Sequence, residues 1–226
     1  MSAFHRFKSS LGNQGIGGTA GKLRALLVDH WFDFRYGLDI CPASELSSLT
    51  IQGGNRDKGY RYEPTRLLTV RRLFRAIEPL LPADPVLVDI GSGKGRALLV
   101  AAEFGFRSAR GVEFAHELCE AARRNCARYK TKTKAATLFE VIESDAARYP
   151  FRPEENVFIF FSPFDDSILR PVVANLVASV QQRPRKALIV YYNPKWAEVI
   201  EQTSVFTPVC KFDFWSIKTS VYSNQP

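Results

Sequence analysis

The sequence lacks the marks of exported, membrane-spanning and metal-binding proteins. No charged segment followed by an apolar one opens the chain, and no run of about 18 apolar residues occurs. The four cysteines form no Cys-x-x-Cys pair, and the three histidines are not spaced as metal ligands. We therefore expect a cytoplasmic protein with no membrane partner, no disulfide framework and no metal site.

The composition suits one well-cored domain. Of 226 residues, 46% are hydrophobic and 12% aromatic, which is enough for one core and an extra N-terminal element but short for two full domains. The formal net charge of +8 favours an acidic partner, such as nucleic acid or an acidic protein, although many basic proteins bind neither.

The first 61 residues read differently from the rest. Residues 11–22 hold five glycines and predict a flexible segment, and residues 22–37 have the pattern of a short amphipathic helix. The pair Gly21-Lys22 resembles part of a phosphate-binding loop, but Leu23 replaces the required Ser or Thr and no strand precedes the pair. We interpret residues 1–61 as a flexible segment with a helical lid or substrate element, and residues 62–226 as the main domain.

Regular alternation begins after Tyr62. Leu67, Val70, Phe74 and Ile77 fall on one helical face, in a helix with Pro64 in its first turn. Short strand-like runs then alternate with helical patterns, and the chain closes on two strand-like runs with no helix between them. The sequence predicts an α/β protein with a doubly wound, mostly parallel, seven-stranded sheet and a C-terminal antiparallel hairpin. The strand-like runs are PVLVDI, ARGVEF, LFEVIES, NVFIFFS and KALIVYY, followed by the tail VCKFDFWSIKTSVYS.

A glycine-rich turn, VDIGSGKGR from Val88 to Arg96, opens the first strand–helix unit. Its glycines are spaced Gly-x-Gly-x-Gly, so Arg96 stands where a dinucleotide fingerprint needs its third glycine. Asp89 would repel a pyrophosphate but attract an ammonium or sulfonium group. S-adenosylmethionine carries both cations, and its carboxylate can bind the helix N-terminus. The alternative is a tight turn that binds no ligand.

Two more acids follow the next two strands. Glu113 ends the second strand, where a carboxylate can accept both hydroxyls of a ribose. Asp145 follows the third strand and is placed to accept a hydrogen bond from an adenine amino group. Either could be a solvated loop carboxylate, but three acids at three successive strand ends favour a nucleoside site.

The order DIGSGKGR, GVEF, SDA, FFSPF resembles the class I S-adenosylmethionine-dependent methyltransferases from Tyr62 to the C-terminus. The phrase Tyr-Glu-Pro-Thr, residues 62–65, is similar to that of small bacterial methyltransferases related to the non-SET, histone-lysine-type lysine methyltransferases. The resemblance implies S-adenosylmethionine as the methyl donor, S-adenosylhomocysteine as the product, and a protein lysine or another amine as the acceptor.

The resemblance also implies roles for particular residues. Glu113 would hold the ribose and Asp145 the adenine. The methionine part would lie on Asp89, Gly91, Ser92, Gly93 and Gly95. The acceptor side would be formed by Tyr62, Ser162, Pro163 and Phe164.

The acceptor residues leave several interpretations open. Base-amine methyltransferases often carry Asn/Asp-Pro-Pro-Tyr/Phe after the fourth strand, and here Ser162 replaces the amide or acid. The same residues could simply start a helix. We expect the hydroxyl of Tyr62 to stay free. The candidates to line an aromatic channel that lowers the pKa of an amine by desolvation are Tyr62, Phe164 and Tyr192.

Other functions remain as alternatives. They are a methyltransferase acting on nucleic acid or a small molecule, a catalytically silent adenosyl-binding module, and a nicotinamide-dependent oxidoreductase, which Asp89 disfavours. The basic segment 123–134 could follow a phosphate backbone or could only satisfy the end of a helix.

Overall fold

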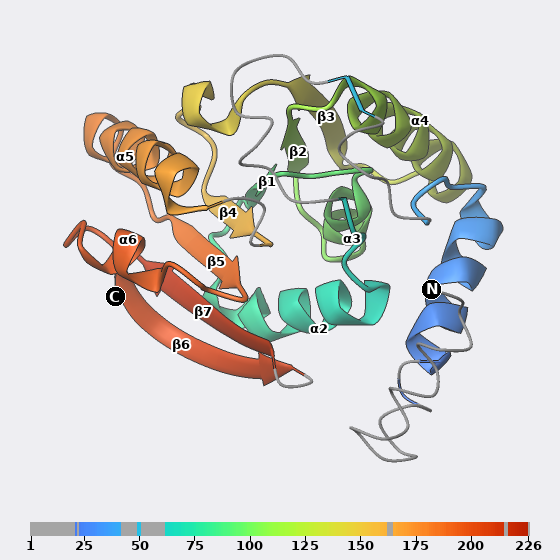
Figure 1. The fold of residues 1–226 in the computed structure, drawn as a ribbon, viewed down its shortest axis with the longest axis horizontal. Coiled ribbons are helices and arrows are strands. Elements are labelled where there is room, and N and C mark those ends of the chain that lie inside the picture. The colour runs from blue at the N-terminus through green and yellow to red at the C-terminus, as the bar shows by residue number, and fades with distance from the viewer. Residues whose placement is uncertain are drawn as a thin grey trace.

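A sheet of seven strands runs through the middle of the protein (Figure 1). The computed structural model describes residues 21, 23–41, 49–50, 62–161, 165–214 and 217–225. Within them the strand order is β3-β2-β1-β4-β5-β7-β6. The bounds are β1 Val86–Ile90, β2 Ser108–Glu113, β3 Leu138–Glu143, β4 Val157–Phe160, β5 Leu188–Tyr192, β6 Thr207–Phe214 and β7 Ile217–Ser223.

Strand direction confirms the predicted sheet. Strands β1 to β5 pair in parallel, whereas β7 runs antiparallel to both β5 and β6. The parallel strands are linked mainly by helices, as the crossover between two parallel strands usually is. The connecting helices are α3 Arg96–Glu103, α4 His116–Thr133 and α5 Asp166–Gln182, and the 3-10 turn η4 Ala146–Arg148 joins β3 to β4.

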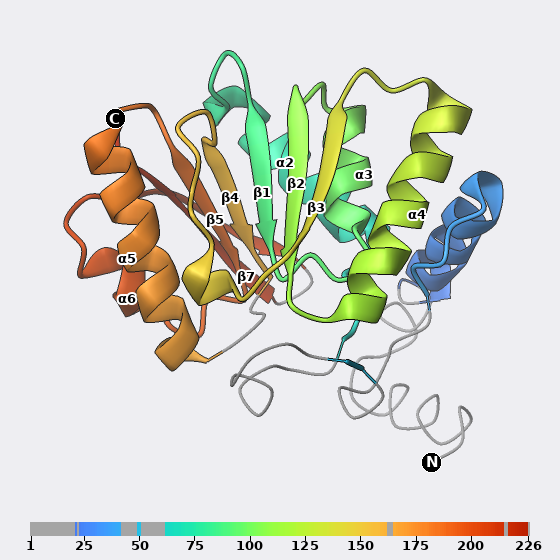
Figure 2. The same ribbon diagram turned by 90° about the horizontal axis from the view of Figure 1, so that it is seen from above.

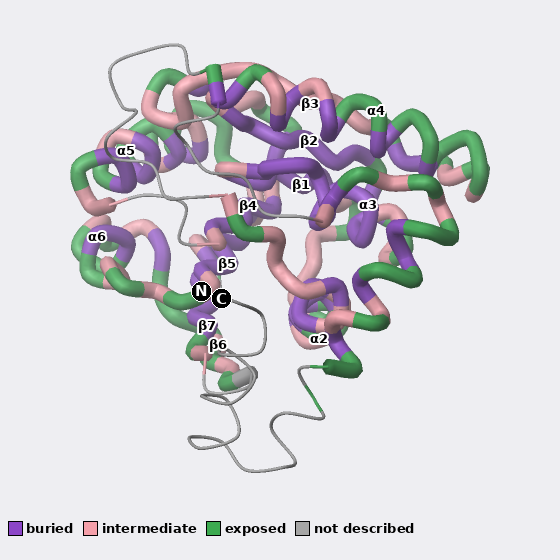
Figure 3. The backbone as a smooth tube through the Cα atoms, turned by 45° about the vertical axis from the view of Figure 1, so that its right-hand side comes forward, coloured by how far each residue is buried: buried purple, intermediate pink, exposed green. Residues whose placement is uncertain are grey.

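The central strands bury both faces, which explains their nearly continuous apolar composition. All five residues of β1 are buried. Leu87 and Ile159 belong to one core cluster, whereas Val88 and Phe158 belong to the other. Because successive side chains of a strand point to opposite faces, each strand supplies both clusters. Figure 3 shows the buried strands at the centre and the exposed outer sides of the helices.

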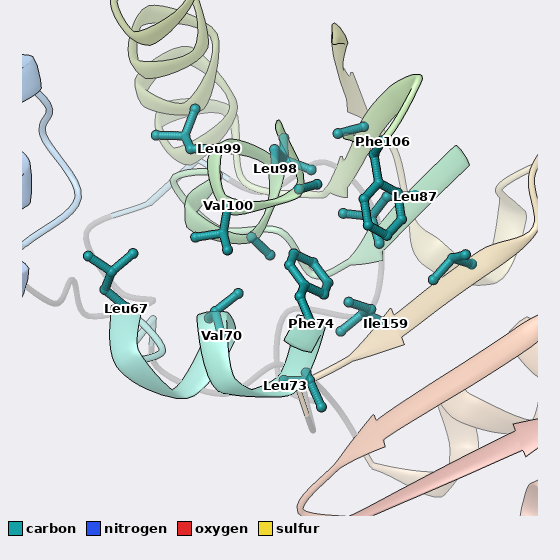
Figure 4. Packing of buried hydrophobic residues seen from close by; sticks show 14 of the residues in the cluster. Leu67, Val70, Leu73, Phe74, Leu87, Leu98, Leu99, Val100, Phe106 and Ile159 are labelled. Atoms are coloured by element: carbon teal, nitrogen blue, oxygen red, sulfur yellow. The ribbon is translucent and has the colours of Figure 1, made fainter. Parts of the chain in front are cut away.

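One face of the sheet is covered by α2 Leu67–Ile77 and α3, as Figure 4 shows. α2 turns Leu67, Val70 and Phe74 inward at the predicted helical spacing. There Phe74 meets Phe106, with ring centroids 5.3 Å apart. The 3-10 turn η3 Glu78–Leu80 then ends the helix around a proline.

The start of α2 differs from the prediction. The helix begins at Leu67, and Pro64 lies ahead of it because Arg66 is still extended, with ψ of 136°. The N–H of Leu67 donates to Asp29 Oδ1 at 2.8 Å. The carboxylate of Asp29, which lies 38 residues earlier in the sequence, therefore caps the N-terminus of α2.

The opposite face is covered by α5, α6 Ala197–Glu201 and η4. Figure 2 shows α5 and α6 on one side of the strands and α3 and α4 on the other. Asp165 caps α5 by accepting from Ser167 N at 3.0 Å. Helices thus cover both faces of the sheet with apolar side chains. The carboxyl ends of the parallel strands lie between these two helical layers.

The expected N-terminal helix covers residues 23–36 and lies beside α4 in Figures 1 and 2. Phe32 and Ile40 are fully buried in the cluster that also holds α2 and α3. The ring of Tyr36 packs at 4.9 Å from both Phe32 and Tyr129 of α4. Residues 23–41 therefore share the core of the main domain.

Candidate cofactor site

The glycine turn follows β1 at the carboxyl edge of the sheet. β1 lies between β2 and β4, where the strand order reverses, and doubly wound sheets bind ligands at this point. Gly91, Gly93 and Gly95 have φ of +79°, +53° and +85°, which residues with a Cβ rarely adopt. The backbone of the turn therefore requires all three glycines.

Close packing also fixes this turn. A Cβ on Gly93 would overlap the ring of Tyr62, and one on Gly111 of β2 would overlap the hydroxyl of Ser92. The N–H of Ser92 donates to Val112 O at 3.2 Å. Ser92 thus packs on β2. Sequence reasoning missed Gly111, for which the available signal is a glycine inside a strand.

Asp89 is a buried acid with an unmet oxygen. Its side chain is 2% exposed, and Oδ1 has no hydrogen-bond partner among the described residues. Burial, reinforced by the charge of Glu113, raises the pKa of Asp89 to about 8. A carboxylate in this setting is costly unless a cation or donor joins it. The site therefore fits a ligand that carries an ammonium or sulfonium group.

Glu113 joins the end of β2 to the glycine turn. Its Oε2 accepts from Gly93 N at 2.9 Å, and Oε1 accepts from Phe114 N and Ala115 N at 2.9 and 3.0 Å. Burial raises the pKa of Glu113, although these three N–H groups oppose the rise. An ionised carboxylate offers about four acceptor sites. Glu113 therefore orders the turn and keeps about one acceptor site for a ribose hydroxyl.

The third acid lies beyond β3. Asp145 is half-buried and accepts from Ala147 N at 3.0 Å, so it caps η4. Nearby, His116 Nδ1 and Glu143 Oε2 are 2.9 Å apart, and this contact raises the pKa of His116. The strand order brings the ends of β1, β2 and β3 side by side, as the nucleoside interpretation requires. Sequence reasoning missed the pair of His116 and Glu143.

Tyr62 lies on the glycine turn. Its ring sits against Gly93, and Lys94 Nζ is 5.7 Å from the ring centroid. The hydroxyl donates to Ile40 O at 3.1 Å, so the prediction of a free hydroxyl was wrong. Burial raises the pKa of Tyr62 well above its ordinary value. The hydroxyl therefore stays protonated and acts as a donor.

The predicted residues Ser162, Pro163 and Phe164 lie outside the described part of the chain. Their neighbours are described: Phe161 follows β4, and its ring centroid is 5.4 Å from that of Tyr192 at the end of β5. Two aromatic side chains therefore meet at the carboxyl edge, one strand away from the glycine turn.

The basic segment of α4 contacts the protein itself. Arg128 Nη1 donates to Gly37 O at 2.7 Å, and Lys132 Nζ donates to Arg35 O at 3.4 Å. These two cations therefore satisfy carbonyls at the end of the 23–36 helix, where positive charge is favourable. Other contacts are Arg123 with Glu120 and Val141 O, Arg124 with Glu120, and Lys130 with Thr137 O.

The described residues include no candidate metal site and no candidate membrane span. No group of three or more His, Cys, Asp or Glu side chains there could hold a metal ion. No helix of that part of the chain is both long and apolar enough to cross a membrane.

Comparison with known proteins gives one family match and several similar folds. Residues 88–165 match a family model described as a methyltransferase domain. No curated protein matches the chain in sequence. An RNA methyltransferase from Salinibacter ruber, solved with S-adenosyl-L-homocysteine, has a TM-score of 0.51 at 21% identity, covering 71% of this chain and 92% of its own.

Two further solved structures share the fold. A protein from Pyrococcus horikoshii has a TM-score of 0.53 at 18% identity, covering 79% of this chain and 92% of its own. A TehB-like SAM-dependent methyltransferase from Corynebacterium glutamicum has a TM-score of 0.50 at 14% identity, covering 68% and 85%. The segment matched by the family model runs from Val88 to Asp165 and contains every residue predicted to hold the cofactor. Residues 88–165 are therefore similar to a methyltransferase domain, and the chain shares the fold of solved S-adenosylmethionine-dependent methyltransferases, in keeping with the resemblance of its motifs.

Proposed function

We propose that this protein is an S-adenosylmethionine-dependent methyltransferase that methylates an amine nitrogen, with the lysine side chain of a protein as the favoured acceptor. The pair of Phe161 and Tyr192 carries the proposal. Both side chains are half-buried and lie at the ends of the adjacent strands β4 and β5, and β4 also pairs with β1, which leads into the glycine turn. Together they would offer an aromatic wall to an acceptor amine at the carboxyl edge of the sheet.

An aromatic wall suits an amine acceptor for a physical reason. A lysine amine has an ordinary pKa of about 10.4 and must lose its proton before it can attack a methyl group. Desolvation by aromatic side chains disfavours the charged amine and lowers its pKa. The reaction then needs no metal and no nucleophilic residue of the protein.

We assign the cofactor to the residues around the glycine turn. The turn would hold the methionine part, with Asp89 near its positive groups. Glu113 would hold the ribose and Asp145 the adenine amino group. When bound, S-adenosylmethionine supplies a methyl group on a sulfonium: the N–C bond forms as the S–C bond breaks, which leaves S-adenosylhomocysteine. The protein contributes alignment and the exclusion of water.

We assign the acceptor side to Tyr62, Ser162, Pro163 and Phe164. The ring of Tyr62 lies on Gly93, at the end of the site where the methionine part would bind. Ser162 stands where base-amine methyltransferases often carry Asn or Asp. Base-amine methyltransferases use that Asn or Asp to accept hydrogen bonds from the nucleobase amine. Its replacement by Ser162 therefore supports an alkyl amine as the methyl acceptor.

The test is transfer of tritiated methyl groups from S-adenosylmethionine into a fractionated cell lysate. We expect the label in protein, recovered as methyllysine after hydrolysis. The matched control is Asp89→Asn, which should reduce labelling in every fraction. Label confined to nucleic acid or to small molecules would overturn the lysine assignment.

A nucleic-acid acceptor is the second candidate. The formal net charge of +8 favours it, and the S. ruber relative is an RNA methyltransferase. Arg124 is exposed and its partner Glu120 lies on the same helix at 3.9 Å, so it remains available to a phosphate. Gel shifts with RNA and DNA at two salt concentrations test this candidate, because phosphate contacts weaken steeply with salt.

A further inference from the structure

We propose that residues 23–41, which precede the matched methyltransferase domain, are a functional part of the cofactor site, with Asp29 and Arg96 as positioning residues. Three residues of the glycine motif each contact this segment directly or through one side chain. The proposal rests on the cofactor assignment made under the proposed function and does not depend on the acceptor.

The first contact is the ion pair behind the turn. Arg96 directly follows Gly95, and its side chain is 4% exposed. Its Nη1 donates to Asp29 Oδ1, and its Nη2 lies 3.4 Å from Asp33 Oδ1. Asp29 also accepts from Arg66 Nη1 at 3.0 Å. The N-terminal helix thus provides the two carboxylates that neutralise a buried guanidinium at the start of α3.

The second contact passes through Asn125 of α4, which is fully buried. Its Nδ2 donates to Lys94 O at 3.0 Å, while its Oδ1 accepts from Asp39 N at 2.8 Å. Lys94 Nζ reaches Asp39 Oδ1 at 3.3 Å. The backbone of the glycine turn is therefore tied to residue 39 by one amide and one ion pair.

The third contact is Tyr62. Its ring presses on Gly93, and its hydroxyl donates to Ile40 O at 3.1 Å. Because Ile40 is fully buried, this carbonyl is held in place by the core. Gly93, Lys94 and Arg96 thus all depend on residues 29–41 for their position.

Two physical effects connect these contacts to cofactor binding. The turn has three glycines at positive φ, and because a glycine backbone populates many other conformations as easily, outside contacts are needed to select this one. Without Asp29, the charge of Arg96 would also be left partly uncompensated beside a site that binds a cation. Both effects predict weaker cofactor binding when the N-terminal helix is perturbed.

The experiment compares two buried carboxylates. Asp29→Asn breaks the pair with Arg96, and Glu155→Gln breaks a buried pair with Arg110, in which Nη1 is 3.0 Å from Oε1. We expect both variants to unfold at a lower temperature. S-adenosylhomocysteine, measured by calorimetry, should bind at least tenfold more weakly to Asp29→Asn and within twofold of wild type to Glu155→Gln.

A second measurement needs no variant. In the full-length wild-type protein, S-adenosylhomocysteine should slow amide hydrogen exchange in residues 29–41 at least as much as in residues 91–96, because coupling between two sites is reciprocal. Exchange in residues 152–156 should not change. The milder variant Asp33→Asn should fall between wild type and Asp29→Asn in affinity. Two results would overturn the proposal. One is an equal affinity of Asp29→Asn and Glu155→Gln for S-adenosylhomocysteine, and the other is amide exchange in residues 29–41 that S-adenosylhomocysteine does not change.

Discussion

Two buried arginines, Arg110 and Arg96, differ in how many of their side-chain nitrogens have hydrogen-bond partners. Arg110 uses all three of its nitrogens: Nε donates to Glu140, Nη1 to Glu155 and Nη2 to Glu154, at 3.0, 3.0 and 2.7 Å. Arg96 is buried as deeply, yet its Nε has no partner among the described residues.

The unmet groups cluster where the ligand is expected. Of five buried side-chain atoms without a partner in the described residues, three belong to Asp89, Ser92 and Arg96. Glu154 and Glu155 instead precede β4, at the opposite end of the strands. Buried polar groups normally have hydrogen-bond partners. We therefore infer that the end of the sheet around Arg110 stabilises the fold, whereas the end with the glycine turn binds a polar ligand.

The largest effect should come from the satisfied end. Arg110→Met removes the cation shared by three carboxylates, and breaking such a buried network costs about 3–5 kcal/mol. Denaturant unfolding should show that loss in the free energy of unfolding. Calorimetry should show an unchanged affinity for S-adenosylhomocysteine. A variant that folds normally but loses the cofactor would refute the separation of the two ends.

The fold was accessible from the sequence because its signals are local and mutually consistent. Apolar runs such as VLVDI predicted central strands, and the spacing of Leu67, Val70 and Phe74 predicted α2. The start of α2 was misplaced because its cap, Asp29, comes from a distant segment. Capping from another part of the chain leaves no local pattern to detect.

The site was only partly accessible. Glycine spacing and strand-end acids located the turn, because each has a local physical cause. The contacts of Arg96 with Asp29, and of Asn125 with Lys94, span 67 and 31 residues of sequence. Long-range pairing of this kind depends on the packed fold, so spacing alone could not reveal it. The hydroxyl of Tyr62 was misjudged for the same reason.

The next largest effect concerns Glu113. Glu113→Ala removes an acid that accepts from Gly93 N, and losing hydrogen bonds to a charged group costs about 1.5–3 kcal/mol. We expect cofactor affinity to fall by that amount in calorimetry. The matched control is Glu143→Ala at the end of the adjacent strand, which should change the affinity little. If the two variants bind equally well, Glu113 has no special role.

A pH titration sharpens the comparison at Asp89. Its pKa of about 8 means that the cofactor-free carboxyl is largely protonated at neutral pH, whereas a cationic ligand prefers the ionised form. Affinity for S-adenosylmethionine should therefore rise with pH, by up to about tenfold per unit below pH 8. The ligand's own amine titrates nearby, so the readout is the ratio of wild-type to Asp89→Asn affinity. A ratio that stays constant between pH 6 and 9 would contradict the cation-binding role.

The same raised pKa predicts how stability changes with pH. Between the ordinary pKa of 3.8 and about 8, the folded protein binds more protons at Asp89 than the unfolded chain. This group's contribution to the free energy of unfolding is therefore complete below the lower pKa and is lost as pH rises through the higher one. Thermal unfolding of wild type against Asp89→Asn should show this loss, and a cationic ligand should reverse it. An Asp89→Asn variant with the same pH dependence as wild type would refute the assignment.

The smallest effect should come from Tyr62→Phe, which removes the hydrogen bond to Ile40 O but keeps the ring on Gly93. One neutral hydrogen bond contributes about 0.5–1.5 kcal/mol, so we expect a small fall in the free energy of unfolding and near-normal cofactor affinity. Tyr62→Ala also removes the ring and should cut methyl transfer at least about tenfold, equivalent to about 1.4 kcal/mol of transition-state stabilisation. Because the ring lies on Gly93, cofactor affinity should fall in this variant as well. The pair of variants therefore separates the hydroxyl from the ring: equal methyl-transfer rates in both would mean that the ring does not shape the turn, and that residues 40 and 62 matter only for packing.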